Sequence, residues 1–364
     1  MNRYDVALVG GGIVGACLAE ELAGTGARVL VLDAGEEPGH ATARAAGVAV
    51  PSLRYLDDPE FYAWLSLGQE ALTGDIRRLE PGHGEFSVRS PLIRMLRRDD
   101  ADLVRSLLPE DSGARWSTAD QLSSDGFRLP EDRHYLVDRN GLMVDGSRYL
   151  RAVRASALSS GVEWLQGTTV SALEPDATGV RVLTPDTERR ADRVVVTAGA
   201  WSGLPGLTSH VPVTPQRGEL VRLGGVEPPP WILSSAHYLA PDTEGGVIVG
   251  ATEENAGFDT SPTVAGTSRL LRYALALAPH YAGAVPLALQ AGLRPVTPTG
   301  RPLVGRVPGQ DRVLVAAGHA GHGLLSARLT ARGLTAAMDR GEWDGLPFSF
   351  CPTENLRRAE EVRA

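Results

Sequence analysis

The chain has 364 residues, of which 43% are hydrophobic and 22% charged, and its formal net charge is −8. The acidic balance argues against nucleic acid as a partner, because binding to a phosphate backbone requires clustered positive charge. No run of about 18 apolar residues occurs, so stable membrane insertion is not expected. All 36 basic residues are arginine, which excludes lysine chemistry such as a Schiff base or a phosphate-binding Walker lysine.

The length exceeds the size at which one hydrophobic core usually stops growing, so two domains are expected. The N-terminus enters a strand pattern almost at once and leaves no room for a signal peptide, which favours a cytoplasmic protein. The two cysteines, Cys17 and Cys351, are too few for a disulfide framework. The oligomeric state stays open, and a homo-oligomer is compatible with the sequence.

The first 33 residues predict a βαβ unit. Residues 4–9 have the pattern of a buried strand, residues 10–15 that of a glycine turn, and residues 16–23 that of a helix, before a second strand that ends at Asp33. In a dinucleotide-binding turn the glycines allow close backbone approach, the helix N-terminus faces the pyrophosphate, and the acid accepts the ribose hydroxyls. A glycine-rich turn without a ligand is the alternative. The predicted contacts are Gly10, Gly12, Ile13, Val14, Gly15, Asp33 and Ala34.

The later segments predict a sheet domain that the chain leaves and re-enters. A helix is expected at 145–160, strands end in a buried run at 194–197, and a similar run from 311 leads into a helix starting near Leu324. Residues 214–291 instead alternate as strands, with one helix near 268–278. The predicted fold is α/β: a doubly wound, Rossmann-like dinucleotide-binding domain, and an α+β substrate domain with a mainly antiparallel sheet. The predicted division is 1–84, 142–213 and 292–364 for the first, and 85–141 and 214–291 for the second.

Several segments in order resemble the D-amino acid oxidase (DAO) superfamily. They are "VALVGGGIVGACLAEELAGTGARVLVLD" at 6–33, "ATARAAGV" at 41–48, "VVVTAGAWSG" at 194–203, "YLAP" at 238–241, "VGAT" at 249–252, "AGLRPVTPTGRPLVG" at 291–305 and "AAGHAGHGLLSA" at 316–327. Within that superfamily the chain most resembles the glycine oxidase of thiamine biosynthesis, with sarcosine oxidase as a more distant cousin.

The resemblance implies FAD as the cofactor, and an FAD-binding domain of the glutathione reductase type as the first domain. Sarcosine oxidases attach the flavin through a cysteine at a place where this chain has Gly292, so a non-covalent flavin is expected. The last motif would run past the pyrimidine edge of the flavin, where a helix N-terminus stabilises the negative charge of the reduced ring. The further contacts that the resemblance implies are Arg44, Ala45, Ala46, Gly47, Val170, Ala198, Gly199, Gly318, His319, Gly321, His322, Gly323 and Leu324.

The resemblance also implies a substrate site. Arg294 matches the carboxylate-binding arginine of glycine oxidases, and Tyr238 the hydroxyl that assists it; a guanidinium fits a carboxylate with two parallel hydrogen bonds. Glu253 lies where a substrate-facing side chain is expected and could attract an amine, but an exposed loop glutamate is the preferred interpretation. His322 is expected to touch flavin or substrate. Gly321 replaces a second arginine, which leaves room for a substrate bulkier than glycine.

These residues predict an oxidase of glycine or, preferably, of an N-substituted glycine. Hydride transfer to flavin N5 would be followed by imine hydrolysis to glyoxylate and an amine, and O₂ would give H₂O₂. No catalytic side chain beyond the flavin is required. The alternatives are an FAD-dependent D-amino acid or proline dehydrogenase that uses an electron carrier, a flavoprotein without turnover, and an NAD-dependent dehydrogenase.

His319 and His322 stand three residues apart, a spacing that also occurs in metal sites. A structural metal site needs further ligands, and this stretch supplies none. No metal is therefore expected, and His319 is expected to pack structurally near the flavin.

Overall fold

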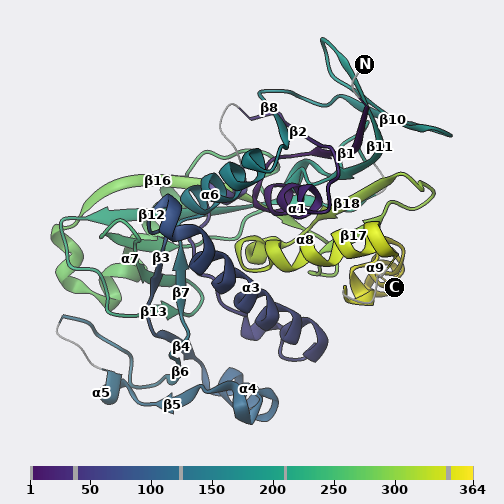
Figure 1. Cartoon of the computed structure of the whole chain (residues 1–364). Helices are drawn as coiled ribbons and strands as arrows, with labels where there is room; N and C mark the ends of the chain where they lie inside the picture. Colours follow the sequence, from purple (N-terminus) through teal and green to yellow (C-terminus); the bar gives the residue numbers. More distant parts are fainter. Residues whose placement is uncertain (1–2, 36–39, 123–125, 209–210, 342–345, 364) are drawn as a thin grey trace.

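Two eight-stranded sheets form the framework of the protein. The computed structural model describes residues 3–35, 40–122, 126–208, 211–341 and 346–363. Figure 1 shows the two sheets with helices α1, α3, α6 and α8 gathered beside the first of them. Among the described residues, no helix is both long enough and apolar enough to span a bilayer.

The first sheet has a parallel centre. Its order is β17-β18-β11-β1-β2-β8, and β1 (Arg3–Val9) pairs in parallel with β2 (Val29–Asp33) and with β11 (Glu188–Val196). Both faces are covered, which explains why these strands read as continuous apolar runs. The remaining strands are β8 (Glu163–Gln166), β9 (Ala172–Asp176), β10 (Gly179–Leu183), β17 (Leu303–Arg306) and β18 (Val313–Ala317).

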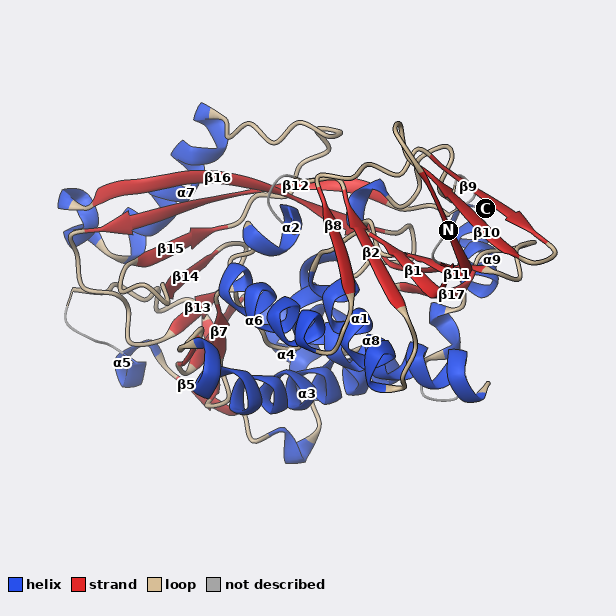
Figure 2. Cartoon of the chain, turned by 45° about the horizontal axis from the view of Figure 1, so that its top comes forward, coloured by secondary structure: helices blue, strands red, loops and turns tan. Residues whose placement is uncertain are grey.

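Four helices lie in front of one face of this sheet (Figure 2). They are α1 (Ile13–Gly24), α3 (Pro59–His83), α6 (Gly146–Ser159) and α8 (Gly323–Arg340), and together with the sheet they bury one large apolar cluster. The prediction that the glycine turn reaches residue 15 was wrong, because α1 already begins at Ile13. Gly15 is needed inside the helix, where an added Cβ would lie 2.1 Å from the carbonyl oxygen of Gly10.

The second sheet is mainly antiparallel, as predicted. Its order is β16-β12-β15-β14-β13-β4-β6-β5, and among the described pairs only β13 with β4 is parallel. Helix α7 (Val264–Leu277) packs on one face of this sheet, and the other face packs on Ala46 and Val48. The strands are β4 (Leu92–Leu96), β5 (Arg115–Ser117), β6 (His134–Asp138), β12 (Thr214–Gly224), β13 (Ile232–Ser234), β14 (Tyr238–Pro241), β15 (Val247–Gly250) and β16 (Val285–Val296).

Local capping explains where the helices begin. The helix predicted at 145–160 is α6, and its cap Asp145 accepts a hydrogen bond from the Arg148 N–H at 2.9 Å. Helix α7 begins four residues earlier than predicted, because Thr263 caps it through the Gly266 N–H at 3.0 Å. The shorter elements are α2 (His40–Ala43), α4 (Arg98–Leu107), α5 (Ala119–Leu122), α9 (Pro352–Arg363), β3 (Ser87–Arg89) and β7 (Leu142–Val144).

The predicted domain division stays a proposal. The first sheet takes its strands from 3–33, 163–196 and 303–317, and the second from 92–138 and 214–296. Two features of the structure cross the proposed boundaries. Strand β3 pairs with β7, and strand β16 continues past residue 291. Backbone hydrogen bonds therefore cross the proposed domain boundaries, while the two large sheets stay separate.

Candidate active site

The turn after β1 leaves no room for side chains. An added Cβ on Gly10 would lie 2.5 Å from the carbonyl oxygen of Thr197 and 2.7 Å from the Cα of Ala198, and Thr197 Oγ1 donates to the Gly10 carbonyl at 2.7 Å. Gly12 is the N-cap of α1 and has no side chain, the Ile13 N–H donates to Thr42 Oγ1 at 3.2 Å, and no acidic residue lies in the first turn of the helix. A helix N-terminus of this kind binds anions through its free N–H groups and its dipole. The turn therefore fits the pyrophosphate of FAD.

Asp33 lies at the end of β2 beside this turn. Its Oδ2 accepts a hydrogen bond from the Gly11 N–H, and its Oδ1 accepts from the Gly35 N–H at 2.9 Å and from Gln166 Nε2 at 3.1 Å. The Thr168 N–H donates to the Asp33 carbonyl at 2.7 Å, which brings the loop carrying Val170 to the same end of the sheet. The carboxylate is thus oriented at the position expected for a ribose contact, and Ala34 follows it, exposed.

Sequence reasoning gave Gly11 and Gln166 no role at this end of the sheet. Gly11 belongs to the same glycine triplet, and its N–H orients Asp33. Gln166 lies 133 residues away from Asp33 along the chain. Only the pairing of β2 with β8 brings it there, so no local signal could have found it.

The loop from Arg44 to Gly47 lies between the two sheets. The Gly47 carbonyl accepts a hydrogen bond from the Val144 N–H at 2.8 Å, and Gly47 has a φ of +85°, in the left-handed region that glycine favours. An added Cβ on Gly292 of β16 would lie 3.0 Å from the Cβ of Arg44. The loop that we expect to run along the flavin, with Ala45 and Ala46, therefore lies against the strand that carries Arg294.

The C-terminal motif forms a tight turn between β18 and α8. Gly318 has a φ of +80°, and an added Cβ there would lie 2.4 Å from Cγ2 of Thr297, so the protein itself already requires this glycine. Nothing lies within 4 Å of an added Cβ on Gly321. Helix α8 begins at Gly323, after a 3₁₀ turn (Ala320–His322), and no side chain caps its N-terminus. No N-cap side chain caps α1 or α8, so the free N–H groups at both helix N-termini are candidates for cofactor contacts.

The two histidines lie in different surroundings. His319 is buried, its Nε2 lies 3.1 Å from Thr330 Oγ1, and burial lowers its pKa to about 4. The ring of His322 instead lies edge-on to Tyr55, with 5.4 Å between centroids. In the described parts of the chain, no three His, Cys, Asp or Glu side chains gather as metal ligands would. Leu324 follows on α8 and is buried.

Arg294 lies on the face of β16 that turns toward the cofactor loop. Its side chain crosses β12 above Gly218, where an added Cβ would lie 2.5 Å from Nη1, and Nη1 donates to the Thr252 carbonyl at 3.0 Å. It forms no ion pair with any described carboxylate. A half-buried guanidinium with most of its donors free is well suited to an anionic ligand.

Tyr238 begins β14, and its ring covers Gly250 of the neighbouring strand, where an added Cβ would lie 2.3 Å from the phenolic oxygen. Burial raises the pKa of Tyr238 to about 12, although Arg294 and Arg222 act to lower it. The hydroxyl therefore stays protonated at neutral pH. It makes no hydrogen bond to a described residue and remains available as a donor.

His322 is surrounded by arginines. Burial lowers its pKa to about 4, and Arg54, Arg294 and Arg94 contribute to the lowering. The imidazole is therefore neutral at pH 7. Glu253 does not stand free on its loop: its Oε1 lies 3.4 Å from Nη2 of Arg54, and both side chains are largely exposed. Arg54 and Arg94 were not singled out in the sequence, because with 36 arginines only their tertiary position distinguishes them.

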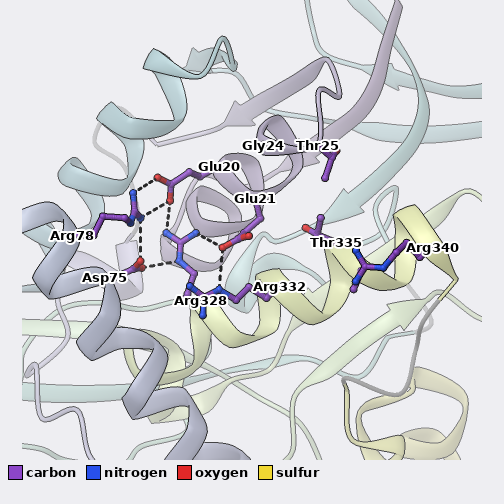
Figure 3. Close-up of a pocket in the computed structure, with 11 residues that line it drawn as sticks. Glu20, Glu21, Gly24, Thr25, Asp75, Arg78, Arg328, Arg332, Thr335 and Arg340 are labelled. Carbon is purple, nitrogen blue, oxygen red and sulfur yellow. Dashed lines mark hydrogen bonds and ion pairs between the residues drawn. The ribbon is translucent and has the colours of Figure 1, made fainter.

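A separate charged pocket of about 520 Å³ lies between α1, α3 and α8 (Figure 3). Arg328 stands at its centre, with ion pairs to Asp75 at 2.8 Å, to Glu21 at 2.9 Å and to Glu20. Arg78 pairs with the same Glu20 at 2.7 Å and with Asp75 at 3.0 Å. Arg332 pairs with Glu21 at 3.4 Å, so three arginines and three carboxylates neutralise one another and join three helices, and this cluster is structural.

A parallel sheet with a glycine turn, an acid at the end of β2 and the N-terminus of α1 at that turn defines a doubly wound dinucleotide-binding protein. The chain belongs to the DAO family, described as FAD dependent oxidoreductase, whose family model matches residues 5–338. The predicted superfamily, the FAD cofactor and the fold class are thereby confirmed.

The similar proteins include several glycine oxidases. The glycine oxidase of Pseudomonas putida is 29% identical over 369 residues, which cover 97% of this chain and 99% of that protein. The crystal structure of glycine oxidase from Geobacillus kaustophilus superposes with a TM-score of 0.88 at 25% identity, covering 96% of this chain and 98% of that one. The structure of iminodiacetate oxidase from Chelativorans sp. matches with a TM-score of 0.81 at 28% identity, over 92% and 95% of the two chains. The chain is thus a glycine oxidase-like flavoprotein.

Proposed function

We propose that the protein oxidises the C–N bond of an N-substituted glycine, releasing glyoxylate and a primary amine, with O₂ as the electron acceptor and H₂O₂ as the second product. The observation that carries this proposal is the unpaired guanidinium of Arg294 beside the free hydroxyl of Tyr238. Together they offer the charge and the donors that a glycine carboxylate requires.

The residues of the site bind and orient the substrate. Arg294 and Tyr238 hold the carboxylate, which fixes the carbon next to it. His322 is neutral at pH 7 and offers one ring nitrogen as an acceptor for the amine N–H. FAD, when bound, accepts the hydride from the carbon that carries the amine. Glu253 is occupied by Arg54, so we assign it to the rim of the site.

The space around Gly321 supports a substituent on the amine. An added Cβ at Gly321 meets no atom within 4 Å, whereas a second arginine at this position would fill that space. The name of one similar protein, iminodiacetate oxidase, also denotes oxidation of a glycine that carries a substituent on nitrogen. Free glycine would leave the space empty and lose the corresponding contacts.

We propose that FAD is held without a covalent bond, by the turns and helix ends described above. Cys17 is fully buried within the apolar cluster on the inner side of α1, at 3.7 Å from the Tyr149 hydroxyl, and burial raises its pKa to about 12. A protonated thiol in the core is a poor nucleophile. The position of Gly292 beside Arg44 carries no side chain that could form the link.

Anaerobic mixing of the purified protein with sarcosine, iminodiacetate, glycine, D-alanine and D-proline tests the proposal. Bleaching of the flavin by N-substituted glycines, followed by rapid recovery in air with release of H₂O₂ and glyoxylate, is the expected result. Slow recovery in air that a quinone accelerates would instead identify a dehydrogenase. Bleaching by D-alanine or D-proline alone would replace the assigned substrate class.

A further inference from the structure

Arg94 is a second arginine without a carboxylate partner, and it is more deeply buried than Arg294. It lies on β4, is 8% exposed, and its Nη2 donates to the Pro51 carbonyl at 2.6 Å. It forms no ion pair with any described carboxylate, and burial lowers its pKa despite the more distant Asp138. A buried guanidinium without a counterion destabilises the folded protein unless an anionic ligand binds to it.

The remaining donors of Arg94 are accessible. Nε and Nη1 have no described hydrogen-bond partner, and the residue keeps 8% of its surface exposed. Arg94 therefore keeps a fork of N–H groups free to bind a ligand. The geometry of this fork fits a carboxylate.

Strand pairing places Arg94 on the same face as Tyr238. Arg94 is in register with Ser234 of β13, and Ser234 is in register with Tyr238 of β14. Residues in register point to the same side of a sheet. Leu92, two residues before Arg94, packs in the same apolar cluster as Tyr238, which confirms the direction. Two strand spacings separate Arg94 from Tyr238, about 10 Å between backbones.

Arg294 lies beyond Tyr238 in the opposite direction, with its guanidinium above β12. Tyr238 thus stands between two unpaired guanidinium groups, and His322 is under the electrostatic influence of both. The third arginine near His322, Arg54, is already neutralised by Glu253. We call the sheet face that carries Arg294, Tyr238 and Arg94 the substrate face.

We infer that Arg94 binds a second carboxylate, carried by the substituent on the substrate nitrogen. This inference rests on the proposed function and narrows it: the substrate class is a secondary amine with two carboxylates, an N-(carboxyalkyl)glycine. Arg294 and Tyr238 hold the glycine carboxylate, the amine lies near His322, and the substituent extends along the substrate face toward β4. The position of Arg94 explains why a buried cation is retained there.

Binding of non-reactive analogues to the wild-type holoenzyme tests the inference directly. Thiodiacetate has the two carboxylates of iminodiacetate with sulfur in place of nitrogen, and (methylthio)acetate lacks the second carboxylate. Titration followed by the flavin absorbance should give a Kd at least about tenfold lower for thiodiacetate, because charged hydrogen bonds are gained. Equal or weaker binding of the dicarboxylate would overturn the inference.

Substitution of Arg94 provides the second measurement. In Arg94→Gln, kcat/KM for iminodiacetate should fall by about thirtyfold or more, while the value for sarcosine changes by less than about threefold. Arg94→Lys should restore part of the loss. Arg89→Gln removes the same charge from an exposed position on β3 and should behave as wild type. Equal losses for both substrates would refute the inference.

The outcomes separate the two proposals. If neither sarcosine nor iminodiacetate bleaches the wild-type flavin, the proposed function fails. If both do so with equal kcat/KM, and the two analogues bind alike, the function stands and the role of Arg94 is refuted. Poor folding of Arg94→Gln does not prevent the test, since the analogue titration uses the wild-type protein.

Discussion

Two groups of arginines in this protein differ in whether carboxylates of the chain neutralise them, and this difference bears on their role. Arg328 is 2% exposed and is surrounded by carboxylates from α1 and α3, with Arg78 completing the cluster. Arg294 and Arg94 are also partly or fully buried, but neither has a carboxylate partner within the described chain. The first group is neutral as built, whereas the second becomes neutral only with an anionic ligand.

The presence or absence of a carboxylate partner distinguishes structural arginines from candidate ligand-binding ones among the 36 arginines of the chain. Neighbouring carboxylates raise the pKa of Arg328 although burial opposes them, while burial is the dominant cause at Arg94 and lowers its pKa. A satisfied cluster holds helices together, and we propose that the unsatisfied cations of the substrate face bind the substrate. Substitutions in the two groups should therefore affect different quantities.

The largest effect is expected for Arg328→Met. The change removes one of the two cations that pair with Asp75 and Glu20 and leaves them only Arg78, and breaking a buried pair in this way costs about 3–5 kcal/mol of unfolding free energy. Denaturant unfolding measures the loss. The KM of the flavin-loaded fraction should stay near the wild-type value. A stable variant with a raised KM would contradict the structural role given to this cluster.

Arg294→Ala should show the converse behaviour. Loss of the carboxylate contact should lower kcat/KM by about a hundredfold or more, mainly through KM, since charged hydrogen bonds contribute about 1.5–3 kcal/mol each. The free energy of unfolding should change little, because Arg294 has no described carboxylate partner that its removal would leave unpaired. Arg222→Ala is the matched control for KM, because the guanidinium of Arg222 already pairs with Asp242. An unchanged KM in Arg294→Ala would remove this residue from the substrate face.

A smaller effect is expected from the acid sensitivity of His319. Its pKa is lowered from 6.5 to about 4 in the folded state, so below pH 6.5 the unfolded chain binds more protons and stability falls as the pH decreases. Between pH 8 and pH 5 this should cost about 2 kcal/mol. His319→Gln should lose less stability over that range, whereas His83→Gln, at an exposed position, should titrate like wild type. Equal pH dependence in all three proteins would refute the assignment.

The smallest effect is expected for Tyr238→Phe. With a pKa near 12 the hydroxyl is a neutral donor throughout the useful pH range, and a single hydrogen bond contributes about 1 kcal/mol. KM should rise by about fivefold with little change in stability. Tyr273→Phe, whose hydroxyl bonds to Ser235 and to the His237 carbonyl, is the control and should leave KM unchanged. If KM rose only in the control, the hydroxyl that contacts the substrate would not be that of Tyr238.

The sequence predicted the cofactor end of the molecule well, because its signals are local. The glycine turn, the helix that follows and the acid at the end of β2 lie within about 30 residues, and each follows from backbone geometry and capping. The prediction was wrong on the start of α1, since the close approach that requires Gly15 occurs inside the helix. The long helix α3 escaped the sequence analysis altogether.

The substrate end was predictable only in part. Arg294 and Tyr238 were singled out by family resemblance, and their contribution to binding stays a prediction. Gly318 was attributed to the flavin, and the structure adds a local reason, because Thr297 already excludes a side chain there. No pattern distinguished Arg94 from the other arginines. Its neighbours Pro51 and Ser234 are 43 and 140 residues away along the chain.

The sequence by itself therefore determined the βαβ unit and its glycine turn, since these depend on short-range geometry and on the dipoles of helix ends, while the FAD cofactor and the oxidoreductase class followed from family resemblance. Only the tertiary structure decided which charges are neutralised and which are not. Whether an arginine has a counterion depends on strands and helices from distant parts of the chain. At Arg328 those elements supply three carboxylates, and at Arg94 and Arg294 they supply none.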